Sequence, residues 1–432
     1  MHDLKLVREQ PDLLRDAMRR RGALDALAPQ LDRLATLEQE RRALIQQVEE
    51  QKAARNASSA EVARRKKAGE SADDLIAQGR TLGESIAALE ARANAADDEL
   101  RAILMEIPNV PLPDVPQGGE DANVVVREWG TPRAPDGVQP HWDVGAALGL
   151  FDLERGAKVS GSGFVVYRGQ GARLVRALMN WFLDVHTSEH GYEEVWAPAI
   201  VNRASMTGTG QLPKFEDDAY AIRDDDLFLI PTAEVPVTNL YRDEVLDAAQ
   251  LPMGFTAYTP CFRREAGSAG KDTRGIQRVH QFDKVELVRY STAEDSAAQL
   301  ELLTGHAETM LQRLGLPYRV KLLAAGDTGF SSAKTYDLEV YAPGVDKWLE
   351  VSSCSVFTDF QARRANIRYR PAPKDKPRFV HTLNGSGLAF PRVIAAILEH
   401  YQQPDGSVAL PEVLHAYAGT DVLRPAEAAA AR

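Results

Sequence analysis

The sequence of 432 residues lacks long apolar runs and contains only two cysteines. No stretch of about 18 or more consecutive apolar residues occurs, which argues against a membrane-spanning helix. The first residues, "MHDLKLVREQPDLL", do not form the apolar core of a secretory signal, so we expect a cytoplasmic protein with no membrane partner. Cys261 and Cys354 form no CxxC pair. They are therefore expected to be small buried residues rather than part of a disulfide framework or a structural zinc site.

An excess of positive charge is also missing. The chain has 62 acidic and 51 basic residues, a formal net charge of -11, which argues against a protein that binds nucleic acid over its whole surface. Basic side chains are nevertheless concentrated in residues 261–286, "CFRREAGSAGKDTRGIQRVHQFDKVE". Guanidinium groups grip phosphate oxygens, and glycines such as Gly267 and Gly275 let a backbone approach a ligand. Nucleic acid or phosphate would then be bound by local patches.

The familiar phosphate-binding loop does not occur in this segment. Gly270 and Lys271 are followed by Asp272 instead of Ser or Thr, and no glycine stands at the spacing which that loop requires. Phosphate would therefore have to be held by side chains on strands as well as by loop backbone. The alternative for so many charges is a solvated surface hairpin.

The first part of the chain has the pattern of long paired helices. From Leu75 to Ile103, apolar and small residues alternate at spacings of four and three, and a weaker seam runs from Leu34 to Val48. The polar segment "ARRKKAGESADD" separates the two seams. We expect an antiparallel helical hairpin with arms of roughly 50 Å; the alternative is a coiled coil that dimerises the protein. The tip of the hairpin would carry Arg64, Arg65, Lys66 and Lys67.

The proline-rich segment "IPNVPLPDVPQGGE" predicts a domain boundary. We expect an N-terminal domain over 1–106, a stiff linker over 107–120 and a second domain over 121–432. In the second domain strand follows strand by turns more often than by helices, so the fold class is α+β with a mainly antiparallel sheet. Flanking helices are predicted at 171–190, 292–315 and 391–403.

The basic segment also places side chains on common strand faces. Arg263 and Glu265 are two residues apart, and so are successive members of the series His280, Phe282, Lys284 and Glu286. Phe282 and Glu286 would lie about 13 Å apart on one face. That span fits a ligand with an aromatic ring at one end and a cationic or hydroxyl group at the other, as in an aminoacyl-adenylate.

Five segments follow one another in an informative order behind the helical hairpin. They are "GTGQLPKF" at 208–215, "TAE" at 232–234, "FRREAGSAGKDTRG" and "HQFDKVE" within 262–286, "EVSSCS" at 350–355 and "NGSGLAFPR" at 384–392. With them the chain resembles the bacterial-type seryl-tRNA synthetases, which are class II aminoacyl-tRNA synthetases, over essentially its whole length. The resemblance implies a coiled-coil arm followed by a class II catalytic domain on an antiparallel sheet. It implies ATP, Mg²⁺, L-serine and tRNA(Ser) as ligands, tRNA(Sec) as a further substrate, and a homodimer with Pro198 at its interface.

The resemblance also implies roles for individual residues. Catalytic roles fall to Arg263 on the α-phosphate, Glu265 near the adenine and triphosphate, and Arg392 on the γ-phosphate. Serine binding falls to Thr232, Ala233, Glu234, Glu286 and Ser386. ATP binding falls to Arg263, Arg264, Glu265, Val279, Phe282, Glu350, Val351, Ser352, Ser353 and Arg392, with Phe282 stacking on adenine. Glu350 and Ser353 match the pair of residues that binds Mg²⁺. The four basic residues of the hairpin tip are expected to bind the variable arm of the tRNA. The basic patch at 361–378 is expected to bind the acceptor end of the tRNA. Pro391 stands where many relatives carry glycine, and proline is compatible with the first turn of a helix.

Three other readings of the sequence remain. A carrier-protein aminoacylating paralogue would lack the long arm and would use zinc ligands. A synthetase for threonine or proline would need a different pocket and an anticodon-binding domain, for which the segment after residue 403 is too short. A coiled-coil scaffold without enzymatic activity would account for residues 30–105 but would leave the five segments unexplained.

Overall fold

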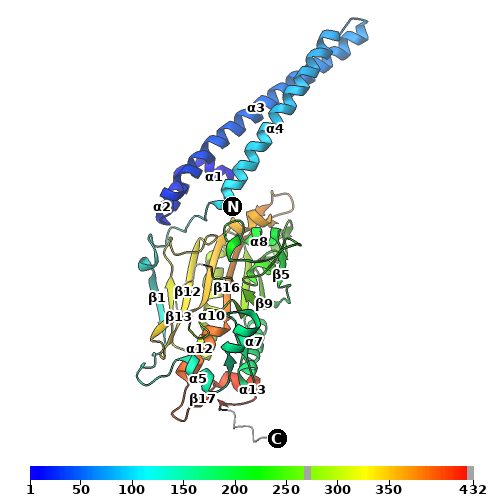
Figure 1. Ribbon diagram of the computed structural model, residues 1–432. Helices are drawn as coiled ribbons and strands as arrows, with labels where there is room; N and C mark the ends of the chain where they lie inside the picture. The colour runs from blue at the N-terminus through cyan, green and yellow to red at the C-terminus, as the bar shows by residue number, and fades with distance from the viewer. Residues whose placement is uncertain (267–273, 426–432) are drawn as a thin grey trace. The chain divides into compact units, whose positions relative to one another are not determined.

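The computed structural model describes residues 1–266 and 274–425 (Figure 1). Its contacts divide the chain into two compact units, Met1–Pro108 and Asn109–Arg432. Among the described residues, no helix combines the length and the apolar character needed to cross a membrane. Gly267, Gly270, Lys271 and Asp272, which entered the comparison with phosphate-binding loops, lie outside the described residues.

The first unit is entirely helical. It consists of α1 (Leu4–Glu9), α2 (Pro11–Arg20), α3 (Leu24–Ala68) and α4 (Asp73–Glu106). The short helices α1 and α2 pack on the beginning of α3, and they bury Val7, Leu14 and Met18 there. Helix α3 ends at Gly69, whose left-handed conformation (φ 77°) lets the chain turn back into α4.

The predicted antiparallel hairpin is confirmed. Ion pairs join Arg33 to Glu99 at 2.7 Å, Arg41 to Asp97 at 2.6 Å and Lys52 to Glu90 at 2.7 Å. Rising residue numbers in α3 therefore meet falling numbers in α4. The seams bury each other within one chain, since a cluster of buried side chains is formed by Leu44, Val48, Ile86 and Leu89. No second chain is needed to cover them.

The outer half of the hairpin has much less core than the inner half. Between Val48 and Ile86 the only buried residue is Ala72. Leu75 and Leu82, which belong to the predicted seam, are only partly buried. Local stability depends on buried apolar contacts, so the part of α3 and α4 nearest the turn is the least tightly held part of the hairpin.

The second unit is built on an eight-stranded sheet. Its strand order is β1-β11-β12-β13-β16-β10-β9-β4. All neighbouring strands are antiparallel except the edge pair β4 and β9, which confirms the predicted α+β class. The strands are β1 (Val124–Trp129), β4 (Glu193–Glu194), β9 (Met253–Phe262), β10 (Gln281–Ser291), β11 (Tyr318–Leu322), β12 (Lys334–Ala342), β13 (Lys347–Thr358) and β16 (His381–Ala389).

Three helices cover one face of this sheet: α7 (Gln170–Ser188), α10 (Ser296–Arg313) and α12 (Phe390–His400). They correspond to the three predicted helices. Together with the sheet they form the largest hydrophobic core, in which Phe182 of α7 packs against Phe390 of α12 with ring centroids 5.5 Å apart. Cys261 and Cys354 are free and buried, as predicted.

Strand β16 lies in the middle of the sheet and was not predicted from the sequence. A β-carbon on Gly385 would come within 2.3 Å of Leu303, and one on Gly387 within 2.6 Å of His186. The two glycines let α10 and α7 approach the strand closely, and they also give it a composition that is unfavourable for strands. Asn384 and Ser386, which alternate with these glycines, point to the opposite face, because side chains alternate along a strand.

Smaller elements surround the sheet. The remaining helices are α5 (His141–Ala147), α6 (Leu153–Ser160), α8 (Arg203–Thr209), α9 (Glu234–Thr238), α11 (Phe360–Ala365) and α13 (His415–Ala418), with 3-10 turns at Glu120–Ala122, Glu216–Asp218, Ala248–Gln250 and Glu412–Leu414. The remaining strands are β2 (Phe151–Asp152), β3 (Val166–Tyr167), β5 (Ile200–Asn202), β6 (Tyr220–Ile222), β7 (Leu227–Leu229), β8 (Val245–Asp247), β14 (Arg368–Arg370), β15 (Arg378–Phe379), β17 (Val408–Ala409) and β18 (Val422–Leu423).

The proline-rich segment is bound to the second unit rather than free. The backbone N–H of Asn109 donates to Phe330 O at 2.9 Å, and that of Leu112 donates to Ala333 O at 2.9 Å. Further along, Pro116 O accepts from the N–H of Ala325 at 2.8 Å. From Asn109 onward the segment therefore belongs to the second unit.

Candidate active site

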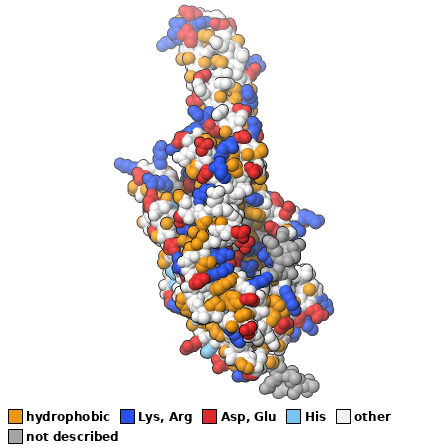
Figure 2. Space-filling view, turned by 90° about the vertical axis from the view of Figure 1, so that its left-hand side faces the viewer, with side chains coloured by type: hydrophobic (Ala, Val, Ile, Leu, Met, Phe, Trp, Pro, Cys, Tyr) orange, Lys and Arg blue, Asp and Glu red, His pale blue; other side chains and the backbone are white. Residues whose placement is uncertain are grey.

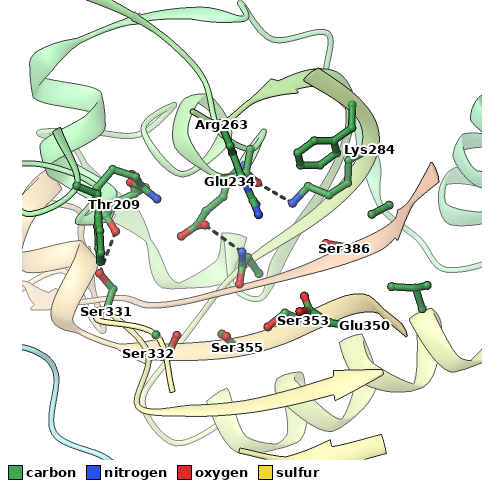
Figure 3. A pocket seen from close by; sticks show the side chains of 18 of the residues that line it. Thr209, Glu234, Arg263, Lys284, Ser331, Ser332, Glu350, Ser353, Ser355 and Ser386 are labelled. Carbon is green, nitrogen blue, oxygen red and sulfur yellow. Dashed lines mark hydrogen bonds between the residues drawn. The ribbon is translucent and has the colours of Figure 1, made fainter. Parts of the chain in front are cut away.

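A cavity of about 430 Å³ opens on the face of the sheet opposite the three helices (Figure 3). Its floor comes from β10, β13 and β16, and its rim from the ends of α8, α9 and α12. The predicted site residues that line it are Thr232, Glu234, Arg263, Glu265, Val279, Phe282, Glu350, Val351, Ser353, Ser386 and Arg392. Segments far apart in the sequence thus contribute to one cavity.

Four of the residues predicted to bind serine or ATP do not line the cavity. Ala233 is fully buried before α9, and Glu286 lies under the floor, only 1% exposed. Ser352 is buried with its hydroxyl donating to Ser386 O at 2.7 Å. Arg264 is exposed, and its backbone N–H donates to Asp218 O at 3.1 Å.

One end of the cavity is acidic and buried. Glu234, at the start of α9, accepts hydrogen bonds from Asn384 Nδ2 at 3.0 Å and from Gln361 Nε2 at 2.6 Å. Burial and, next, the nearby charge of Glu286 raise the pKa of Glu234 to about 7, against the opposing effects of the Gln361 hydrogen bond and the charges of Lys284 and Arg263. At neutral pH this carboxyl group is therefore close to half ionised.

Lys284 connects the acidic end to the rest of the floor. Its ammonium group forms an ion pair with Glu286 and donates to Thr232 Oγ1 at 2.9 Å. Asn384 also donates to Glu286, at 2.9 Å. The sequence reasoning did not assign Lys284 or Asn384 to the site, although Lys284 shares a predicted strand face with Phe282 and Asn384 begins the quoted "NGSG" segment.

Three arginines, Arg263, Arg278 and Arg392, line the cavity, and the charge of Arg263 lowers the pKa of Glu234. The guanidinium carbon of Arg263 lies 5.1 Å from the ring centroid of Phe282, and Arg263 Nε donates to Pro231 O at 3.3 Å. Arg278 donates to Glu265 Oε2 at 2.6 Å. Arg263 and Glu265 do both line the cavity, but not through strand alternation: β9 ends at Phe262, and Glu265 has a left-handed backbone with φ 52°.

Arg392 is held at the start of α12, one residue after Pro391. Proline occupies the first turn of this helix, where its missing N–H has no partner to lose. One guanidinium nitrogen donates to Glu350 O at 2.7 Å and lies 3.6 Å from Glu350 Oε2, and Arg392 Nε donates to Gln277 O at 3.1 Å. The arginine thus joins β13 to the segment that precedes β10.

A further carboxylate lies beside Glu350 and Ser353. Asp337 of β12 is the register partner of Ser353 on β13. Burial raises the pKa of Asp337 well above its usual value, and the charge of Glu350 adds to this shift. Asp337 Oδ1 is buried and has no hydrogen-bond partner among the described residues. Oxygen ligands of this kind suit a hard cation. In the described parts of the chain, no group of three or more His, Cys, Asp and Glu side chains could hold a metal ion. A cation in this corner would therefore also have to use the Ser353 hydroxyl.

The four basic residues of the predicted tRNA site lie at the end of α3, before the turn. Arg64 and Arg65 donate to Glu61 at 2.7 and 3.3 Å, and Arg65 also pairs with Asp74 at 3.2 Å. Lys66 and Lys67 are exposed. Figure 2 shows basic and acidic side chains mixed at this end of the hairpin.

The second basic patch, at 361–378, is not one solvated surface. Arg364 is buried, stacks against Phe360 at 5.0 Å and donates to Leu212 O at 3.2 Å. Arg363 is paired with Asp359 at 2.8 Å. Only the later part of the patch, from Lys374 onward, is largely exposed.

Comparison with known proteins gives matches to both units. Residues 1–111 match the family described as the seryl-tRNA synthetase N-terminal domain, and residues 214–401 match the class II tRNA synthetase core domain for glycine, histidine, proline, serine and threonine. The serine–tRNA ligase of Gemmatimonas aurantiaca is 69% identical over 98% of this chain and 100% of its own length.

Solved structures agree with these matches. The seryl-tRNA synthetase from Pyrococcus horikoshii, complexed with ATP, superposes with a TM-score of 0.95 at 39% identity over 99% of this chain and 100% of that chain. The cytoplasmic serine–tRNA ligase from Naegleria fowleri, in complex with AMP, gives a TM-score of 0.89 at 29% identity over 99% of both chains. On these matches, this chain belongs to the seryl-tRNA synthetase family of class II aminoacyl-tRNA synthetases.

Proposed function

We propose that this protein is an ATP-dependent ligase that joins L-serine to tRNA(Ser). The observation that carries the proposal is the charge of one cavity, which is lined by the buried carboxyl group of Glu234 and by Arg263 and Arg392, with Glu286 buried behind the lining. A seryl-adenylate has the complementary groups, since it carries an ammonium and a hydroxyl group as well as a phosphate and an adenine ring.

In the first step the serine carboxylate attacks the α-phosphorus of ATP and pyrophosphate leaves. A carboxylate is already ionised at neutral pH, so this step needs no general base, and positioning and charge neutralisation supply the catalysis. Arg263 would bind the α-phosphate, Phe282 would stack on adenine, and Arg392 would bind the γ-phosphate. Glu265 is held by Arg278 at the rim and would contact the adenine and triphosphate side.

Glu350 and Ser353 would hold Mg²⁺ in the acidic corner beside Asp337. The ion would supply positive charge to the triphosphate. The unpaired oxygen of buried Asp337 supports this assignment, because an extra positive charge nearby would offset its carboxylate.

In the second step a hydroxyl of the 3′-terminal ribose of the tRNA attacks the adenylate carbonyl. Thr232, Glu234 and Ser386 would contact the serine side chain and ammonium group, with Glu286 and Ala233 buried behind the lining. A site that hydrogen-bonds the serine hydroxyl rejects alanine and glycine strongly, because its buried polar groups would be left unpaired. Threonine has to be excluded by size, which discriminates less.

The helical hairpin of the first unit would bind the tRNA. Serine tRNAs have a long variable arm, and structured RNA is recognised mainly through shape and backbone contacts. Arg64, Arg65, Lys66 and Lys67 would contact that feature, and the exposed part of the 361–378 patch would lie near the acceptor end. tRNA(Sec) is a second proposed substrate.

We also propose that the protein forms a homodimer in the cytoplasm. Trp196 is 75% exposed and Pro198 and Ile200 beside it are exposed too. A large exposed aromatic next to other exposed apolar residues is typical of an interface.

ATP–pyrophosphate exchange with each proteinogenic amino acid in turn tests the activity. We expect exchange with serine and weak or no exchange with threonine, alanine or proline. Aminoacylation of unfractionated tRNA with labelled serine then tests the transfer step. Exchange that depends on another amino acid, or no exchange at all, would disprove the proposal.

A further inference from the structure

A buried pair, His141 and Glu399, lies outside the cavity lining but is hydrogen-bonded to one of its walls. Both side chains are fully buried. His141 begins α5, and its Nδ1 lies 2.7 Å from Glu399 Oε1, which also accepts from the His141 backbone N–H at 2.9 Å. Glu399 Oε2 accepts from the N–H of Gly344 at 2.8 Å. Three hydrogen bonds from two segments therefore fix this carboxylate.

These partners determine the tautomer of His141. Because Glu399 accepts, Nδ1 carries the proton, and Nε2 is left with a lone pair. Nε2 is 3.3 Å from the backbone N–H of Ile276, which donates to it. The imidazole thus connects the carboxylate on α12 to the backbone just before β10.

Gly275 lets the chain approach this close to the ring. Its φ is 72°, and a β-carbon there would lie 2.3 Å from His141 Nε2 and 2.9 Å from the ring of Trp142. Glycine tolerates both this conformation and this close approach. The contact with the His141 ring therefore fixes the position of the backbone at Gly275.

Helix α12 holds this segment at two points. Arg392 donates to Gln277 O at 3.1 Å, and Glu399 reaches Ile276 through His141. Arg392 and Glu399 are seven residues apart, which is nearly two helical turns, so they lie on the same side of α12. The next residue after Gln277 is Arg278, which binds Glu265.

We propose that His141 and Glu399 are positioning residues for the nucleotide end of the cavity. They hold Ile276 and Gln277 so that Arg392, Glu265 and Val279 keep the arrangement that receives the triphosphate and adenine. The serine end has no hydrogen bond to this pair among the described residues, so the pair acts on ATP and not on serine. The inference rests on the proposed function in taking ATP to be the nucleotide.

Two substitutions of His141 separate the positioning role from packing. In His141→Asn the amide nitrogen replaces Nδ1 and keeps a donor for Glu399, but nothing replaces the Nε2 acceptor. In His141→Gln the longer side chain can place an amide oxygen near the Nε2 position. We expect His141→Asn to raise the KM for ATP about tenfold, the scale for leaving one buried N–H without an acceptor. We expect His141→Gln to stay within about threefold of wild type, and both variants to leave the KM for serine unchanged.

Glu399→Gln tests the same connection from the other end. In Glu399→Gln one carboxylate oxygen becomes an NH2 group, which faces either the N–H of Gly344 or both donors of His141, so the hydrogen bonds that hold the imidazole are weakened in either orientation. We expect the same selective rise in the KM for ATP without any change in the residues that line the cavity. His415→Asn is the control for losing a histidine–backbone hydrogen bond elsewhere, since His415 Nε2 donates to Leu410 O at 2.9 Å and no hydrogen bond among the described residues joins its side chain to the cavity.

Calorimetric titration of each variant with ATP in the absence of amino acid makes the test independent of the serine reaction. If wild type binds ATP but activates another amino acid, the proposed function fails and this inference stands. Equal effects of His141→Asn and His141→Gln would overturn it. A parallel rise in the KM values for ATP and serine, tracking a lower unfolding midpoint, would also overturn it, because the pair would then only stabilise the fold.

Discussion

Glu234 and Glu286 accept hydrogen bonds from the same amide nitrogen, Asn384 Nδ2, at 3.0 and 2.9 Å. One neutral donor therefore lies between two buried carboxyl groups. Lys284 supplies a positive charge to Glu286, whereas the partners of Glu234, Gln361 and Asn384, are both amides. The charges of Lys284 and Arg263 lower the pKa of Glu234, but no ion pair joins Glu234 to a described residue, and the ammonium group of an amino acid would supply a direct one.

The first prediction concerns pH. Burial raises the pKa of Glu234 to about 7, so the group changes from mostly protonated to mostly ionised between about pH 6 and about pH 8. Because the ionised form attracts the ammonium group of serine, we expect the KM for serine to fall about tenfold over this interval in exchange assays. The KM for ATP serves as the internal reference.

Glu234→Gln is the control for this effect. The amide keeps the size of the side chain but cannot ionise, so the KM for serine should stay high and lose its dependence on pH in this interval. A wild-type KM that does not change between about pH 6 and about pH 8 would rule out Glu234 as the titrating group in serine binding.

The second prediction concerns Arg263. Arg263→Lys keeps the charge but loses the planar fork that binds two phosphate oxygens, and it loses the contact of the guanidinium group with Phe282. We expect serine-dependent exchange to fall at least about 100-fold, with the circular dichroism spectrum unchanged. Exchange close to the wild-type rate would mean that another group stabilises the charge on the α-phosphate.

The third prediction concerns Glu286, which the cavity lining does not include. Glu286→Ala should cost about 2 to 4 kcal/mol in kcat/KM for serine, because it removes a partner of Asn384 and leaves Lys284 as an unpaired buried charge. The double variant with Lys284→Met removes that charge. We expect it to restore the unfolding midpoint but not the use of serine. Recovery of both together would mean that Glu286 only neutralises Lys284.

The sequence predicted the hairpin, the three covering helices and the antiparallel sheet, because each follows from local periodicity. It did not predict β16, where Gly385 and Gly387 are required by the close approach of α10 and α7. Such a requirement comes from neighbours distant in the sequence and leaves no strand pattern. The contacts made by the segment predicted as a stiff linker over 107–120 could not be read from the sequence for a similar reason, since the backbone partners of Asn109 and Leu112 are more than 200 residues away.

The site was predicted through five segments, and the residues between and behind them were missed. Strand alternation correctly placed Phe282 and Lys284 on one face. The sequence did not show the partners of Lys284, because its contact with Thr232 forms only in the folded chain, where Lys284 also pairs with Glu286. Gln361 was predicted only as the first residue of the basic patch at 361–378, and not as part of this site. Its amide donates to Glu234 and its oxygen accepts from Thr382 at 2.7 Å, and no motif marks a residue whose only partners are buried side chains and backbone.

The last prediction concerns the arm, and the structure indicates where to shorten it. The cluster of Leu44, Val48, Ile86 and Leu89 closes the inner half of the hairpin. Residues 50–84 can therefore be replaced by a short glycine-serine turn without removing that core. Because the cavity residues all belong to the second unit, we expect serine-dependent exchange within about threefold of wild type and a loss of at least about 100-fold in transfer to tRNA.

The charges at the tip allow a finer test of the same prediction. Arg64 and Arg65 are already paired with Glu61 and Asp74, whereas no hydrogen bond or ion pair joins the side chains of Lys66 and Lys67 to other described residues. Binding RNA phosphate releases counterions, and each neutralised contact lowers the salt dependence of binding. Replacing both lysines with glutamine should thus flatten the salt dependence of tRNA affinity more than replacing both arginines, with exchange unchanged in each case. If the shortened protein became monomeric but still charged tRNA at the normal rate, the arm would be a dimerisation element and its proposed role in RNA binding would be wrong.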